Sequence, residues 1–488
     1  MERQRQSFES GWRIVCRGQI EKMASYPSIR PAFQTAGLWV LISSATLGIL
    51  TVLVWLAGDG GGIAAGLMLI SSCILALLYC GLFLRNQLQP IATLSLCYFY
   101  FGFALPGLYQ LRTSQYYWSS SAVSPEQEVV AATITLLATL GLSIGVFLCR
   151  DRISVAAEVA EPRNRPGIRR KAVLIASTIA VSITAAAFVQ LGPIPFFAPR
   201  AAASIYYQSQ GIQLTQIGLG RTLTQGVSIG ALCLALHSWF VVGLRGPTVL
   251  VGLILAIGIN LVSNFPLAIA RYYMLALGVV VGLTALRSLA LATHRVVKVL
   301  IPLALFFVFP TLGQFNRHTE IQWSFHDISL AEYLSHGDLD GFQSLMNVAK
   351  AVSIEGFSFG HGFLTVLLFF VPRSLWPSKA EPTGSLAAEY AHYSFFNISM
   401  PFPGELYFNG GYLLVFFGMI LIGFAIMYLD KKIFSGGSLT EFAILLAAFS
   451  PILLRGSLLS TVSAFASSLF VIILSKNLAS LRILPRKN

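Results

Sequence analysis

Long apolar runs separated by short polar segments recur along most of the 488-residue chain. Runs of about twenty apolar residues predict helices long enough to cross the ~30 Å hydrocarbon core of a bilayer. About twelve such helices are expected, at residues 37–57, 62–84, 91–111, 129–149, 172–190, 223–244, 248–263, 266–286, 297–313, 405–429, 440–454 and 458–475. The pattern predicts an all-α, polytopic integral membrane protein with a single membrane-embedded domain over residues 37–475.

Two long stretches interrupt this pattern, at residues 191–222 and 314–404. The second contains one more apolar run, Phe357 to Val371, of about fifteen residues. That length suits an interfacial or re-entrant helix better than a crossing. We therefore expect a large loop that carries short helices, and a second loop whose Gln, Tyr and Gly residues suit sugar hydroxyls.

Composition supports the membrane assignment, and the distribution of charge gives a topology. Only 11% of residues are charged, against about a quarter in soluble proteins. If the N-terminus is cytoplasmic, about 24 of the 33 Lys and Arg residues lie on the cytoplasmic side, as the positive-inside rule requires. The tails 1–36 and 476–488 are then cytoplasmic, and the two long loops are periplasmic.

Several functional classes lack their sequence signals. The net charge of +13 flanks the spans and forms no separate basic domain for nucleic acid. The six cysteines show no CxxC spacing and the histidines no HxxxH or HExxH spacing, so no metal or other cofactor is expected. The N-terminal segment lacks the apolar core and cleavage site of a signal peptide, which predicts a retained tail.

Four arginines on the predicted outer side occupy unusual places for surface charges: Arg221, Arg271, Arg373 and Arg455. An unpaired arginine within a helix bundle costs about 2.5 kcal/mol or more, and acidic partners are nearly absent from the nearby spans. Their convergence would indicate an anionic ligand, because a guanidinium group binds phosphate oxygens bidentately. The alternative is that each arginine separately reaches lipid headgroups as an anchor.

One of these arginines lies in the stretch FFVPRSLWPSK, residues 369–379. Pro372 and Pro377 end the helix and fix the backbone, and Trp376 is typical of a membrane interface. We expect this rigid segment to hold Arg373 ready for a phosphate. A plain helix stop with an interfacial Trp–Arg pair is the alternative.

If a sugar hydroxyl is the acceptor, a base must lie within hydrogen-bonding reach of it. Glu405 is the first candidate for a catalytic base, followed by His392 and Asp340; each is also a plausible cap or loop residue. The expected secondary substrate contacts are Arg200, Lys379, Trp376 and Tyr407.

The segments GFSFGHGFLTVLLFFVPRSLWPSKAEPTG (356–384) and PFPGELYFNGGYLLVFFG (401–418) resemble bacterial O-antigen polymerases of the Wzy type. The resemblance spans roughly residues 190–475. In the family a proline directly follows the lysine of the PRSLWPSK block, whereas here Ala380 and Glu381 precede Pro382. By resemblance, Arg221, Arg271, Arg373 and Arg455 match arginines that the family retains, and Glu405 matches its acid after the PxPGE-like turn.

The resemblance implies a fold of the GT-C membrane glycosyltransferase kind in the bacterial inner membrane, with its active site facing the periplasm. It implies polymerisation of undecaprenyl-pyrophosphate-linked oligosaccharide repeat units into O-antigen, capsular or exopolysaccharide chains. The growing glycan would pass to the non-reducing-end hydroxyl of the next lipid-linked unit. Membrane lipid and a chain-length regulator protein are the further partners expected.

Three other functions stay open. An O-antigen ligase shares the outward arginines, and the PRSLWP block is what favours a polymerase. A lipid-linked oligosaccharide flippase or other transporter predicts internal repeats and polar residues near the membrane midplane, whereas here polar groups gather near one face. The third alternative is a purely structural partner in the membrane.

Overall fold

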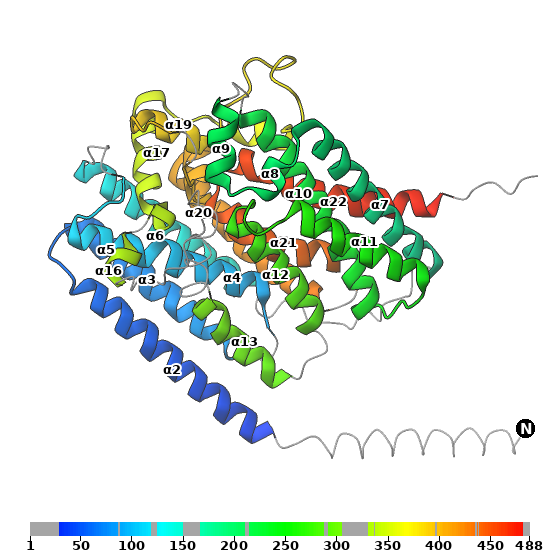
Figure 1. Ribbon diagram of the computed structural model, residues 1–488. Coiled ribbons are helices and arrows are strands. Elements are labelled where there is room, and N and C mark those ends of the chain that lie inside the picture. The colour runs from blue at the N-terminus through cyan, green and yellow to red at the C-terminus, as the bar shows by residue number, and fades with distance from the viewer. Residues whose placement is uncertain are drawn as a thin grey trace, which may run out of the picture.

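The computed structural model (Figure 1) describes residues 29–85, 88–118, 124–149, 166–209, 214–286, 291–304, 330–335, 337–395, 398–434, 437 and 439–481. Throughout these ranges the regular structure is helical, apart from one isolated antiparallel bridge between Ser399 and Gly456. The all-α prediction is confirmed for this part of the chain.

Each predicted span coincides wholly or partly with a helix. These helices are α2 (Ile29–Trp55), α3 (Gly62–Leu82), α4 (Pro90–Phe99) with the π-helical turn η1 (Tyr100–Ala104) and α5 (Leu105–Thr113), α6 (Pro125–Leu148), α7 (Pro166–Leu191), α10 (Leu214–Leu236) with the π-helical turn η2 (His237–Val241), α11 (Pro247–Ser263), α12 (Arg271–Leu286), α13 (Leu291–Leu303), α20 (Phe402–Ile433), α21 (Thr440–Arg455) and α22 (Leu458–Ser480). Residues 305–313 of the ninth predicted span lie outside the described residues.

Seven of these segments are long and apolar enough to cross a membrane. They are residues 62–82, 90–113, 125–148, 169–191, 220–241, 402–433 and 458–480. The chain is therefore a polytopic membrane protein by the length and composition of its helices, and the count of twelve spans stays a prediction.

The described parts of the two long loops contain short helices. The first carries α8 (Ile194–Phe197) and α9 (Arg200–Ser209). The second carries α16 (Leu330–Leu334), the 3₁₀ turn η4 (Gly337–Leu339), α17 (Gly341–Glu355), α18 (His361–Leu367) and α19 (Thr383–Tyr390). The short apolar run predicted to be interfacial thus contains a helix of only 7 residues, far below the length of a crossing.

Some predicted boundaries were wrong by several residues. The eighth span was predicted from Pro266, with Arg271 about one turn inside the helix. Residues 265–270 form turns instead, and α12 begins at Arg271. The predicted tails are also shorter than expected, because α2 begins at Ile29 and α22 continues to Ser480.

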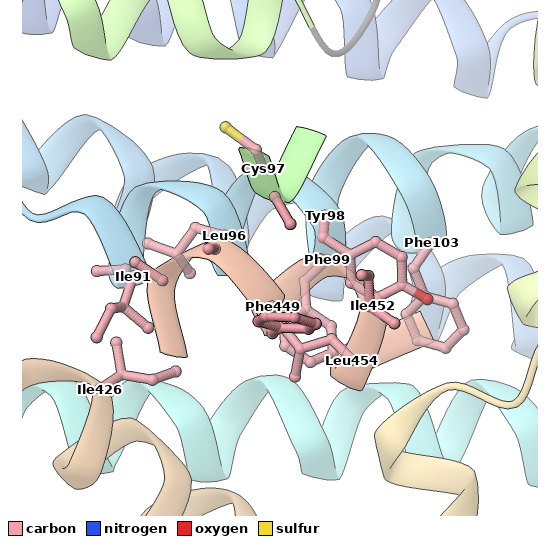
Figure 2. Packing of buried hydrophobic residues seen from close by; sticks show 14 of the residues in the cluster. Ile91, Leu96, Cys97, Tyr98, Phe99, Phe103, Ile426, Phe449, Ile452 and Leu454 are labelled. Atoms are coloured by element: carbon pink, nitrogen blue, oxygen red, sulfur yellow. The ribbon is translucent and has the colours of Figure 1, made fainter. Parts of the chain in front are cut away.

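The segment α4–η1–α5 is the centre of the bundle. In its most apolar 18-residue stretch, 89% is buried inside the protein. The same share is 33% for α7 and 50% for α3 and α6. A helix that is apolar on all sides is stable in such a position because protein covers every face. Figure 2 shows side chains of α4 beside Ile426 of α20 and beside Phe449 and Ile452 of α21.

The C-terminal helices α20, α21 and α22 lie between the N-terminal helices α2–α6 and the middle helices α7–α13. α20 packs along α6, α22 packs along α10 and α7, and α21 contacts α12 and α4. In Figure 1 the orange helices lie between the blue and cyan N-terminal helices and the green middle ones. Helix α21 therefore contacts both the N-terminal and the middle helices, and it also packs against α20 and α22.

Two GxxxG pairs allow the closest of these contacts. Gly141 and Gly145 of α6 face the backbone of α20, and Gly226 and Gly230 of α10 face α22. A Cβ atom on Gly145 would collide with the carbonyl oxygen of Ile420. Such small-residue pairs let helix backbones approach closely in membranes. Here they bring α6 close to α20 and α10 close to α22.

We predict that Gly145→Ala lowers the stability of the protein in detergent by about 1–3 kcal/mol, because overpacking would push α6 away from α20. Gly258→Ala is the matched control, since a Cβ atom at Gly258 of α11 meets nothing within 4 Å. Thermal unfolding of the two variants beside the native chain checks this. Equal melting of the variants would contradict the close-packing role of Gly145.

Candidate functional site

The polar groups predicted to carry the chemistry gather at one end of the bundle. α12, α20 and α22 begin there, α21 ends there, and α8, α9 and α16–α19 lie over it; we call it the loop end. The described contacts that follow join these elements directly.

The first residues of α12 run through the middle of the loop end. Tyr273 interacts electrostatically with both Arg200 and Arg221. Its neighbour Tyr272 lies under Arg455, with the guanidinium carbon 5.2 Å from the ring centroid. Arg271 is buried and interacts electrostatically with Tyr333. One turn of helix therefore links four of the predicted arginines.

Arg221 is the most isolated of these charges. Its side chain is buried, with 7% of the residue exposed, and its guanidinium carbon lies 4.5 Å from the centroid of the Phe196 ring. Neither terminal nitrogen has a hydrogen-bond partner among the residues that the structure describes. Arg200, which is exposed, is close enough to repel the Arg221 guanidinium group, and an anion nearby would offset this repulsion.

Arg455 is held by an acidic partner from the long loop. Asp340, just before α17, accepts hydrogen bonds from Arg455 (3.4 Å), from the Trp118 indole (3.0 Å) and from the Ser399 hydroxyl. The bridge between Ser399 and Gly456 fixes the loop against the turn between α21 and α22. Asp340 is buried, so it and Arg455 form a fixed pair beneath the loop.

Glu405 joins the beginnings of three helices. One carboxylate oxygen accepts a hydrogen bond from the Thr383 hydroxyl of α19 at 2.7 Å. The other accepts from the Ser457 hydroxyl at 3.0 Å and from the Leu458 backbone amide at 2.9 Å, at the start of α22. The residue is 2% exposed. This arrangement is that of a helix-capping group, and it leaves Glu405 poorly placed to accept a proton from a substrate.

The PRSLWPSK block closes on itself. Arg373 donates hydrogen bonds to the carbonyls of Lys379 (2.6 Å) and Ala380 (3.0 Å) and pairs with Glu381 at 3.0 Å. Lys379 donates in the opposite direction, to the carbonyls of Phe369 (2.7 Å) and Val371 (2.8 Å). Burial lowers the pKa of Lys379, and the charge of Arg373 lowers it further.

The described contacts of Arg373 thus lie within its own loop, and the structure does not bring it to Tyr272 and Tyr273 with the other arginines. The helix was predicted to end at Pro372 and Pro377, but α18 already ends at Leu367, five residues before Pro372. The backbone carbonyls that Arg373 and Lys379 bind hold the segment that follows.

The remaining predicted residues have packing or surface positions. Trp376 packs against His361, with ring centroids 5.6 Å apart, and Tyr407 packs against Phe357 at 5.6 Å. His392 is exposed just after α19, with a left-handed backbone at φ 57°. Within the described ranges, no group of three or more His, Cys, Asp and Glu side chains could hold a metal ion.

Sequence reasoning missed several residues of this end, including Trp118, Thr383, Ser399 and Ser457, because ordinary polar or aromatic residues carry no local signal. Tyr272 and Tyr273 could have been found, since they directly follow an arginine at a helix start.

A second buried network at the opposite end was also missed. Glu441 of α21 accepts hydrogen bonds from Arg169 of α7 and pairs with His237 (2.9 Å) and with Lys476 of α22 (3.3 Å). Because it joins α7, η2, α21 and α22 far from the loop end, we interpret it as a structural clamp.

Comparisons of the chain with protein-family models, curated proteins and solved structures give no match.

We predict that Glu405→Ala destabilises the protein by about 2–4 kcal/mol, because it leaves three buried donors without an acceptor. Glu389→Ala, at an exposed position of α19, should melt like the native chain. Thermal unfolding in detergent measures both. If Glu405→Ala melts normally and loses only activity, the capping role is wrong and the base role predicted from the sequence gains support.

Proposed function

We propose that this chain polymerises undecaprenyl-pyrophosphate-linked oligosaccharide repeat units at the periplasmic face of the bacterial inner membrane. The observation that carries the proposal is the buried guanidinium group of Arg221, which lies beside Arg200 and has no hydrogen-bond partner among the described residues. An anion of two or more negative charges is the ligand that this arrangement favours most. The resemblance of residues 356–384 and 401–418 to the polymerase family points to the same ligand class.

The proposed reaction is the transfer of a growing glycan. The bond between its first anomeric carbon and the pyrophosphate oxygen breaks, and both electrons stay on the undecaprenyl pyrophosphate. The non-reducing-end hydroxyl of the next lipid-linked unit forms the new glycosidic bond and gives up its proton to a base.

The arginines would stabilise the leaving group. Arg221 and Arg200 would bind the pyrophosphate. Arg271 begins α12, and Arg455 at the end of α21 lies over Tyr272 of that first turn. Positive groups fixed before the reaction stabilise developing charge without reorganisation. Arg373 would act indirectly in this scheme, by keeping its loop in shape over the loop end.

Asp340 and His392 stay the candidate bases. Asp340 is buried and accepts hydrogen bonds from three donors, as Glu405 does, whereas His392 is exposed. Asp340 already accepts a hydrogen bond from an alcohol, the Ser399 hydroxyl, and it lies beside Arg455. The base has only to lie within hydrogen-bonding reach of the acceptor hydroxyl. An acceptor hydroxyl would have to displace Ser399 from this carboxylate.

We predict that Arg221→Ala lowers polymerisation about 10²-fold or more, the usual cost of removing one preorganised charged donor. The assay uses the full-length protein in lipid nanodiscs with a lipid-linked repeat unit, and measures the glycan ladder by gel. Arg245→Ala is the control, because Arg245 also lies over an aromatic ring, Trp239 at 4.4 Å, but at the opposite end of α10.

Three results would count against this proposal. Long glycan made by Arg221→Ala at the native rate would remove the arginine from the reaction. Absence of any ladder from the native protein would exclude polymerisation. Transfer only to a lipid A core acceptor would identify a ligase instead.

A further inference from the structure

Residues 357–375 of the long loop expose an unusual amount of apolar surface. Phe359 is 86% exposed, Leu375 78% and Leu367 73%. Phe357, Leu364 and Phe370 are exposed as well. We call these six side chains the apolar loop patch. Contiguous exposed apolar side chains of this size normally mark an interaction surface.

The backbone presents one of these side chains at a conformational cost. Phe359 has φ 46°, in the left-handed region that residues with a side chain rarely adopt. Gly356 and Gly360 beside it have φ 84° and 85°. The turn therefore holds a large apolar side chain outward in a strained conformation, which argues against an accidental exposure to water.

Hydrogen bonds fix the loop to α20 at Phe408 and Asn409. The amides of Ser358 and Gly360 donate to the carbonyls of Phe408 (2.9 Å) and Asn409 (3.1 Å), and the Phe363 amide donates to the Asn409 side chain at 3.2 Å. Helix α20 is kinked at Gly410–Gly411, where its own hydrogen-bond ladder is interrupted. The loop thus takes up carbonyl groups that the kink would otherwise leave free.

The kink at Gly410–Gly411 lies where the length of α20 predicts the boundary of the membrane. From Tyr412 to the basic pair that begins at Lys431 the helix has about twenty residues, and at 1.5 Å per residue it covers the ~30 Å hydrocarbon core. Leu413 and Phe417, just past the kink, are exposed as lipid-facing residues should be. The loop is hydrogen-bonded to Phe408 and Asn409, directly before this exposed apolar part of α20 begins.

The charges of the segment also suit a lipid surface. Residues 357–379 contain Arg373 and Lys379 and no acidic residue; the first acid, Glu381, pairs with Arg373. Trp376 lies beside them, half-buried. Cations and a tryptophan next to an apolar face are typical of segments that lie in the plane of a bilayer interface.

We propose that residues 357–375 lie in the boundary between headgroups and acyl chains at the loop end, with Phe359, Leu367 and Leu375 inserted among the acyl chains. The segment enters one leaflet, remains at its surface and does not cross. This placement is independent of the proposed glycan chemistry, because it rests on exposure, strain and attachment to α20.

The test uses the full-length chain in nanodiscs, with its native cysteines replaced and one spin label attached at a time. Phe359→Cys and Leu367→Cys report on the patch, Phe417→Cys gives a lipid-facing reference, and Ser209→Cys gives an exposed polar reference on α9. Collisions with oxygen, which concentrates in lipid, are compared with collisions with a water-soluble nickel complex.

The expected result is that labels at 359 and 367 resemble the label at 417, with oxygen collisions several-fold favoured over those at 209. Labels at 359 and 367 that meet the nickel complex as freely as the label at 209 would overturn the proposal. A strong spin–spin coupling between labels at 359 on separate copies would also overturn it, by showing that a second copy covers the patch. Neither result depends on polymerase activity, so a failed proposed function and a failed placement remain distinguishable.

Discussion

A guanidinium group buried at the edge of a membrane needs an acceptor for its hydrogen bonds, and hydrocarbon offers none. This constraint shapes the whole loop end. Arg455 pairs with Asp340, which lies 115 residues earlier in the sequence. Arg373 and Lys379 take backbone carbonyls of their own loop. Arg221 lies near Phe196, Tyr207, Tyr273 and Arg200, and its terminal nitrogens have no hydrogen-bond partner among the described residues. We therefore propose an anionic ligand at this position.

The helices position these groups through contacts that leave little freedom. The small residues of α6 and α10 bring α20 and α22 close, and the Glu441 clamp holds the opposite ends of α7, α21 and α22. With both ends constrained, the starts of α20 and α22 meet at Glu405. The same helix contacts fix the position of the kink in α20, and the loop that bears the apolar loop patch is hydrogen-bonded beside this kink. Site and membrane placement thus depend on one set of helix contacts.

The sequence predicted the existence of the helices well, because long apolar runs are a local property. Their ends were harder: Arg271 was placed inside a helix that in fact begins at that residue, because the turn residues 265–270 (FPLAIA) are as apolar as the helix that follows. Partners could not be predicted at all. Asp340, Ser399 and Arg455 meet only in the folded chain, and nothing local distinguishes Glu405 as a cap from Glu405 as a base. The roles of these site residues, and the polymerase function, stay predictions.

We propose that the loop end binds a lipid-linked diphosphate through its arginines. Native mass spectrometry of the intact protein can compare undecaprenyl pyrophosphate, undecaprenyl phosphate and undecaprenol as ligands. The account predicts the strongest binding for the pyrophosphate, and a loss of that preference when both Arg200 and Arg221 are replaced by alanine. Equal binding of the pyrophosphate and the uncharged undecaprenol by the native protein would contradict it.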